Sequence, residues 1–278
     1  MPTNTLRFVS VASGAAHALA ITESGSVVAW GRNDAGQCNV PSVASNSVLA
    51  VAAGDAHSLA LLSSGSVLAW GDNSFGQSSV PQGLSGVRAI AAGRNHSLAL
   101  RTNGTVAGWG FNAYGQASAP VLSNVAAIAA GYLHSVALLS NGTVIVWGDN
   151  TFGQTNVTAG LTNLVGIAAG DFHTLALRAE GSVVGWGDDS YRQIEVPDSV
   201  TNVFAVASGN YHGLALTPAR SILQPTLVSG QLVIRWSGFG TLQWAPALQG
   251  PYTDVDYQGT SYTNLDMSAP ARFFRLRR

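Results

Sequence analysis

The stretch of residues 51–81, VAAGDAHSLALLSSGSVLAWGDNSFGQSSVP, decides the fold, because its landmarks return along most of the chain. A Gly precedes the His by three residues, and a second Gly, a Trp-Gly pair and a Gln follow at fixed distances. All six histidines take part, at intervals of 38 to 40 residues: His17, His57, His96, His134, His173 and His212. Five tryptophans and five glutamines recur in phase: Trp30, Trp70, Trp109, Trp147 and Trp186, with Gln37, Gln77, Gln116, Gln154 and Gln193. Such a period is typical of tandem-repeat folds.

Within each repeat the apolar runs are short and bounded by Gly, which predicts β-strands. The second repeat has runs at Leu49–Ala53, His57–Leu62 and Val67–Trp70, and a fourth segment ends near Pro81. The small residues of the first run suit the crowded axis of a propeller. A tight Gly turn follows the second run, with positive φ expected at both central positions. Proline in the fourth segment predicts an outer edge strand. The pattern therefore predicts an all-β fold, a β-propeller.

The repeats predict about six blades over residues 1–220, incomplete or part of a seven-bladed ring. After the last His, Pro225 stands where Trp is expected, so we predict that Gly230–Trp236 supplies the missing third strand. Residues 221–278 lack the repeat and predict a small β-sandwich-like module that docks on the propeller. Its strands are expected at these positions: Gln231–Trp236, Thr241–Trp244, Tyr252–Val255, Ser261–Leu265 and Arg272–Leu276.

Composition excludes several classes of function. Only 10% of residues are charged, and the sequence has no lysine, which excludes a Schiff-base lysine and a phosphate-binding P-loop. Residues 1–217 carry 7 Arg and 11 acidic residues, a net charge of −4, whereas residues 218–278 carry 6 Arg and 3 acidic residues, a net charge of +3. A repeat region with that balance is a poor match to nucleic acid. No apolar run is long enough to span a membrane, and no signal peptide is recognised. We expect a monomer and leave the compartment open.

The repeated polar residues are interpreted as scaffold. One His per blade lies too spread around a ring to ligate one metal, so we expect each His to form hydrogen bonds within its own blade. The tryptophans are expected to pack between blades. Asp and Asn after Trp-Gly predict loop-capping turns, since they lack the spacing of a calcium loop. Cys38, the single cysteine, is predicted to be an ordinary strand residue. No Ser, His and carboxylate set breaks the repeat, so we predict no enzyme, no catalytic residue, no metal and no cofactor.

Two loop positions vary among the repeats and carry the predicted binding site. The first lies between the repeat Gly and His, and the second lies just before Gly-Gln. A propeller returns each position to the same face, and aromatic residues and Arg are enriched at binding hot spots. For the second position, packing within its own loop is the alternative to binding. The predicted partner-binding residues are Asp55, Arg94, Tyr132, Asp171, Phe172 and Tyr211 from the first position, and Phe75, Tyr114, Phe152 and Tyr191 from the second.

The sequence resembles the repeats of the regulator of chromosome condensation superfamily. The resemblance rests on Gly-x-x-His, the second Gly, Trp-Gly, Asn and Gly-Gln over residues 8–217. The short repeat is most similar to that of the compact bacterial beta-lactamase inhibitor protein II group, which implies an extracellular protein. The superfamily implies a propeller, commonly of seven blades, and a protein partner. We therefore predict a non-enzymatic protein-binding propeller. The alternatives are guanine-nucleotide exchange on a small GTPase, for which the even spacing leaves no protruding insertion, and an extracellular glycan-binding or glycan-acting protein.

Overall fold

The computed structural model is built from β-strands and divides into two compact units, Met1–Thr217 and Pro218–Arg278. It describes residues 7–45, 47–198 and 200–217, and in the second unit 222–228, 231–237, 241–245, 253–254, 261–264 and 273–277. Within these ranges no helix is long and apolar enough to cross a membrane.

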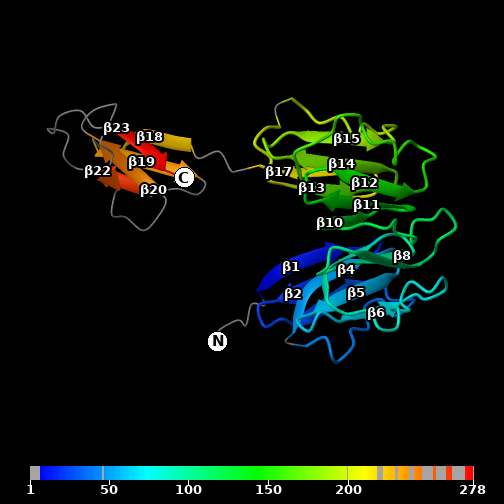
Figure 1. The fold of residues 1–278 in the computed structure, drawn as a ribbon. Coiled ribbons are helices and arrows are strands. Elements are labelled where there is room, and N and C mark those ends of the chain that lie inside the picture. Colours follow the sequence, from blue (N-terminus) through cyan, green and yellow to red (C-terminus); the bar gives the residue numbers. More distant parts are fainter. Residues whose placement is uncertain are drawn as a thin grey trace. The chain divides into compact units, whose positions relative to one another are not determined.

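The first unit consists of five three-stranded antiparallel sheets and one two-stranded sheet (Figure 1), here called blades one to six in chain order. Each blade keeps its strands in sequence order, so neighbouring strands are joined by hairpins. The strands are β1 (Phe8–Ser13), β2 (His17–Thr22), β3 (Val27–Gly31), β4 (Val48–Ala53), β5 (His57–Leu62), β6 (Val67–Gly71), β7 (Val87–Ala92), β8 (His96–Arg101), β9 (Val106–Gly110), β10 (Val125–Ala130), β11 (His134–Leu139), β12 (Val144–Gly148), β13 (Leu164–Ala169), β14 (His173–Arg178), β15 (Val183–Gly187), β16 (Ala205–Ser208) and β17 (Gly213–Leu216).

Consecutive blades pack against each other, which confirms the predicted β-propeller. β4 contacts β1 and β2 of the preceding blade, and the relation repeats as far as β16, which contacts β13 and β14. The small residues that end the first strands surround the axis, as predicted from their crowding: Ser13, Ala53, Ala92, Ala130, Ala169 and Ser208. Blades one and six are the two ends of this arc.

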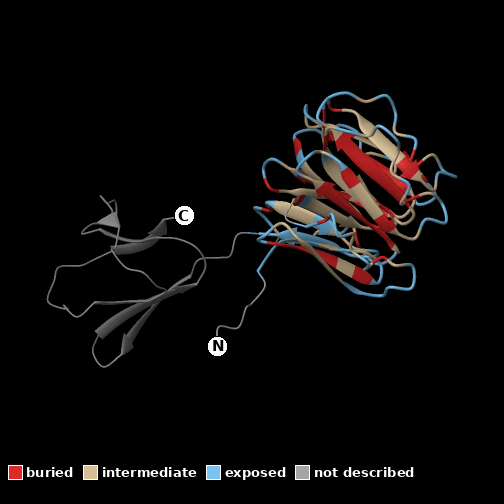
Figure 2. Ribbon diagram, turned by 90° about the horizontal axis from the view of Figure 1, so that it is seen from below, coloured by how far each residue is buried: buried red, intermediate tan, exposed pale blue. Residues whose placement is uncertain are grey.

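The apolar core lies between blades. Leu59, Leu61 and Val67 of blade two pack with Val87, Ala99 and Trp109 of blade three, and equivalent clusters join other neighbouring blades. Figure 2 shows the buried residues along the strands and the exposed residues along the loops. Burial of this kind is the dominant stabilising contribution to a fold with so few ion pairs.

The repeat histidines connect neighbouring blades. His96 Nε2 lies 2.9 Å from Ser135 Oγ in the next blade, and His57 makes the same contact to Ser97 at 3.0 Å. Ser97 donates its single proton to the carbonyl oxygen of Gln77, 2.9 Å away, so the histidine must donate from Nε2. The prediction that each His bonds within its own blade was therefore wrong. The structural role stands, but it acts across the junction.

Each repeat glutamine holds both its own loop and the next blade. The side chain of Gln77 is fully buried: its Oε1 accepts the Phe75 N–H at 2.9 Å and its Nε2 donates to Asp72 at 2.7 Å. Its main-chain oxygen accepts the indole N–H of Trp109 at 2.9 Å. Trp70, Trp147 and Trp186 make the same bond to the glutamine one blade earlier. Four of the five repeat tryptophans thus pack between blades, as expected.

The two ends of the arc leave the corresponding apolar surfaces uncovered. Trp30 belongs to blade one, which has no preceding blade, and it is 50% exposed, whereas Trp70 is 7% exposed. At the other end Leu214 and Leu216 of β17 are 57% and 58% exposed. The equivalent residues of blade two, Leu59 and Leu61, are buried against blade three.

Two local predictions about the blade were wrong. In the hairpin turns only the Gly has positive φ, as at Gly104 (φ 80°), and Asn103 before it does not. The segment before Pro81 forms no strand among the described residues, so a full blade has three strands. The main-chain N–H of Val80 instead donates to Ser78 O at 3.2 Å within the loop.

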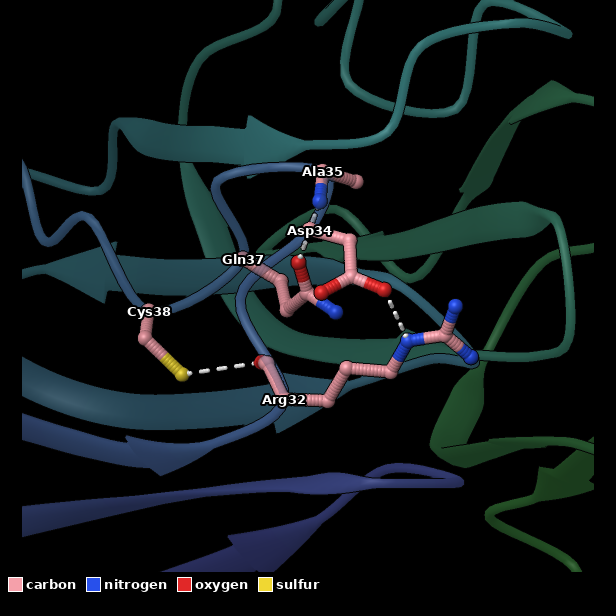
Figure 3. A network of polar contacts seen from close by, with 5 residues as sticks. All are labelled: Arg32, Asp34, Ala35, Gln37 and Cys38. Atoms are coloured by element: carbon pink, nitrogen blue, oxygen red, sulfur yellow. Dashed lines mark hydrogen bonds and ion pairs between the residues drawn. The ribbon is translucent and has the colours of Figure 1, made fainter.

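Cys38 lies in a loop, not in a strand as predicted. Its Sγ donates to the main-chain oxygen of Arg32 at 3.3 Å (Figure 3). In the same loop Arg32 Nε donates to Asp34 at 2.6 Å, and Gln37 Oε1 accepts the Ala35 N–H at 2.9 Å. Arg32 occupies the slot of Asp72, so its ion pair with Asp34 replaces the bond that Asp72 makes to Gln77.

The second unit contains two three-stranded sheets, in the orders β18-β19-β22 and β21-β20-β23. Its strands are β18 (Ile222–Val228), β19 (Gln231–Ser237), β20 (Thr241–Ala245), β21 (Thr253–Asp254), β22 (Ser261–Asn264) and β23 (Phe273–Arg277). β19 is the central strand of its sheet, paired on both edges. The prediction that Gly230–Trp236 completes the last blade was therefore wrong for the described part of that segment, residues 231–236.

Candidate functional site

The variable residues that directly follow the repeat glycines meet at the propeller axis. They line a cavity of about 150 Å³ to which all six blades contribute. Each lies in the loop between the first and second strands of its blade, so the fold brings residues 39 positions apart into one ring. The ring positions are Ala15, Asp55, Arg94, Tyr132, Asp171 and Asn210.

A continuous chain of contacts runs from this cavity out to the second variable position. Arg94 Nε donates to Asp55 at 3.0 Å, and the Arg94 guanidinium lies 4.1 Å from the centroid of the Tyr132 ring. The Tyr132 and Phe172 rings are 5.2 Å apart, and the Phe172 and Phe152 rings 4.9 Å apart. We call the surface formed by Asp55, Arg94, Tyr132, Asp171, Phe172 and Phe152 the loop face.

The two carboxylates of the loop face differ in their partners. Asp55 pairs with Arg94, whereas the Asp171 side chain makes no hydrogen bond or ion pair among the described residues. Burial raises the pKa of Asp171 to about 6, and the charge of Asp55 raises it further, against a lowering by Arg94. Burial also raises the pKa of Asp55, and Arg94 opposes that rise. Asp171 is thus a carboxylate whose charge is poorly compensated inside the protein.

The remaining predicted residues are placed apart from this chain. Phe75 packs edge-on against Phe111 at 5.0 Å, and Tyr191 packs with Tyr211 at 5.2 Å. Tyr114 makes no ring contact among the described residues and is 52% exposed. Sequence reasoning therefore named one connected group and three outlying aromatic positions. It missed Phe111, although an apolar residue in a slot that holds Asp72, Asp149 and Asp188 in other repeats was a usable signal.

The second variable position does not bury its side chains within its own loop. Phe152 is 47% exposed and Tyr191 is 69% exposed, although the main-chain N–H of each is held by the glutamine two residues later. The loop backbone is thus ordered by the scaffold while the aromatic side chain faces outward. Rigid, exposed aromatic side chains suit binding, because little conformational entropy remains to be lost.

The acidic residues after Trp-Gly are engaged in capping. Asp72 accepts hydrogen bonds from Ser74 and Gln77, and Asp188 from Ser190 and Gln193. The bond from Ser74 is the main cause of the lowered pKa of Asp72. Among the described residues no group of three or more His, Cys, Asp or Glu side chains is arranged to hold a metal ion.

The sequence model of the regulator of chromosome condensation (RCC1) repeat matches five segments, residues 8–37, 48–77, 87–116, 125–154 and 164–193. The chain belongs to the RCC1 repeat family. The matched segments are blades one to five, and the two-stranded blade six lies outside them. A search of the curated proteins gave no match. The similarity to the compact bacterial repeats remains a prediction.

Solved structures with the same fold come from several eukaryotes. Prp20p of Saccharomyces cerevisiae, studied for its binding to Gsp1p and histones, is 22% identical with a TM-score of 0.64, covering 82% of this chain and 72% of that one. Human WBSCR16 is 22% identical with a TM-score of 0.64, covering 79% and 75%. The ectodomain of the receptor kinase CR4 of Physcomitrella patens is 24% identical with a TM-score of 0.62, covering 82% and 65%. At these identities the likeness establishes the fold alone.

Proposed function

We propose that this RCC1-repeat protein is a non-enzymatic binding propeller that docks a protein partner on the loop face. The observation that carries the proposal is the continuous chain from Asp55 through Arg94, Tyr132 and Phe172 to Phe152. Every member of this chain stands at a position that varies among the repeats. The invariant residues build the blades, so their replacement would serve no binding specificity.

The partner we propose presents a basic group to the axial cavity and an apolar surface to the rings beside it. Asp171 has no counter-charge in hydrogen-bonding contact, and a Lys or Arg side chain of the partner would supply one. Tyr132 and Phe172 offer the aromatic surface that dominates many protein interfaces. The cavity of about 150 Å³ is large enough for a side chain rather than for a folded segment.

The experiment is affinity capture from the native source with the immobilised full chain, followed by measurement of the dissociation constant for each captured protein. Phe172→Ala should weaken a partner that uses the loop face about tenfold or more. Tyr114→Ala is the matched control, because Tyr114 is an exposed aromatic outside the chain of contacts, and its effect should stay within about twofold. If Phe172→Ala left the affinity of every partner unchanged, the loop face would not be the docking surface.

The electrostatic part of the proposal has its own test. Asp171→Asn should weaken the same partner, and lowering the pH from 7 to 5 should weaken the unsubstituted chain as Asp171 takes up a proton. The Asp171→Asn chain should lose part of that pH dependence. An affinity that is the same at both pH values would argue against a basic group at Asp171.

A further inference from the structure

Blade six lacks the third strand that completes each of the other blades. Among the described residues β17 pairs with β16 alone, so its outer edge is open. In blades one to five that edge is covered by a strand with Val and Trp three residues apart, such as Val183 and Trp186 of β15. Here the chain continues into β18, which pairs with β19 in the second unit.

The open edge borders an apolar groove of about 300 Å³. Its walls come from blade five and from β17, with Leu175, Val183, Val200 and Leu214 among the apolar lining residues. Tyr191 and Tyr211 lie in ring contact at its side. Arg192 and Glu195 form an ion pair at 2.6 Å, so the pair adds no net charge to the groove. Apolar and main-chain contacts would therefore decide what binds.

Two hydrogen-bonding groups beside the groove lack the partners that their equivalents have. The main-chain oxygens of Gln37, Gln77, Gln116 and Gln154 each accept an indole N–H from the next blade, whereas Gln193 O has no such donor among the described residues. His173 is 0% exposed, and its Nε2 has no partner because Gly213 replaces the hydroxyl residue found there in blades two to five.

We propose that the open edge of β17 binds a tryptophan-bearing β-strand from a second polypeptide. The strand would pair antiparallel with β17, as β15 pairs with β14, and its Trp indole would donate to Gln193 O. The four complete junctions of this protein carry the argument, since each contains that strand in the same surroundings. Addition of a strand to an exposed sheet edge is a common mode of peptide recognition. This proposal does not depend on the loop face.

The probe is a synthetic peptide copied from residues 182–188, SVVGWGD, titrated into the full chain by isothermal calorimetry. We expect saturable one-to-one binding. Replacing the peptide Trp by Phe keeps an aromatic ring but removes the N–H donor, and should weaken binding about fivefold to tenfold. A scrambled peptide should not bind.

Two variants of the protein localise the site. Val200→Glu places a charge in the groove and should abolish binding, while Val121→Glu makes the same change at a fully exposed position outside it and should have no effect. Circular dichroism establishes that both variants fold. No binding by the folded chain, or equal affinities for the Trp and Phe peptides, would overturn the proposal. A chain found to be dimeric, and not dissociated by the peptide, would place a second copy in the groove and overturn it as well.

Discussion

The indole nitrogen of Trp109 lies 2.9 Å from the main-chain oxygen of Gln77, in the blade before it. Ser97 Oγ donates to the same oxygen at 2.9 Å, and His57 in turn contacts Ser97 at 3.0 Å. One buried carbonyl thus holds two side chains of the next blade. The repeat motif is therefore a description of the junction between blades as much as of the blade.

The indole bond should contribute measurably to stability. Trp109→Phe removes the N–H donor and part of the buried ring, and should lower the free energy of unfolding by about 1–3 kcal/mol. Trp30→Phe is the control, because Trp30 is 50% exposed and donates to no carbonyl among the described residues. Its effect should stay below about 0.5 kcal/mol. Urea unfolding followed by circular dichroism measures both, and equal losses would contradict the role of the junction.

Stability should fall as the pH is lowered from about 6.5 towards 4. Burial lowers the pKa of His57 and His134 to about 4 and that of His96 to about 3, with a further lowering from neighbouring histidines. Below 6.5 the unfolded chain takes up protons that these buried rings refuse. Each ring then contributes a slope of up to about 1.4 kcal/mol per pH unit.

The raised carboxylate pKa values oppose this slope. Between its ordinary value of 3.8 and about 6, Asp171 holds a proton in the folded chain that the unfolded chain has lost, so its contribution falls as the pH rises. The histidines outnumber it, so the net slope should stay positive. Urea midpoints between pH 7.5 and 5 test this. His96→Gln should reduce the slope, whereas His212→Gln, at an exposed histidine without a following blade, should leave it unchanged.

The repeat glycines before each His should not tolerate a side chain. A Cβ at Gly93 would collide with the carbonyl oxygen of Gly131 in the next blade and with the His96 ring. Gly93→Ala should therefore destabilise the protein by about 3 kcal/mol. Gly166→Ala is the matched control, because its Cβ would meet Leu177 at an ordinary 3.4 Å and other blades have Ala in this slot. A similar loss for both substitutions would show that the close approach is not the cause.

The sequence predicted the parts of the fold that each repeat determines locally. The three runs of blade two, the Gly turns and the loop caps follow from periodicity and turn chemistry, and the structure has them. The direction of the His57 hydrogen bond could not be read from the sequence, because its partner Ser97 is 40 residues away and becomes a neighbour only through packing between blades.

The site was predicted in the same measure. Symmetry placed Tyr132 and Phe172 on one face, since equivalent loops return to equivalent places. It could not say that Arg94 would reach both Asp55 and Tyr132, since that depends on side-chain conformation. Nor could it foresee that β19 pairs within the second unit rather than with blade six, since an apolar run of this kind fits either sheet.

The unpaired nitrogen of His173 can be supplied with a partner by one substitution. Gly213→Ser places a hydroxyl where the next blade offers Ser or Thr elsewhere, and Leu175 Cδ1, which would lie 2.6 Å from the new Cβ, must rotate away. The new hydroxyl would accept from His173 and donate to Gln193 O, and should stabilise the protein by about 0.5–1.5 kcal/mol. Gly213→Ala adds the same Cβ without the hydroxyl and should give no such gain. If Ala stabilised as much as Ser, the gain would come from a restricted unfolded backbone and not from the restored hydrogen bond.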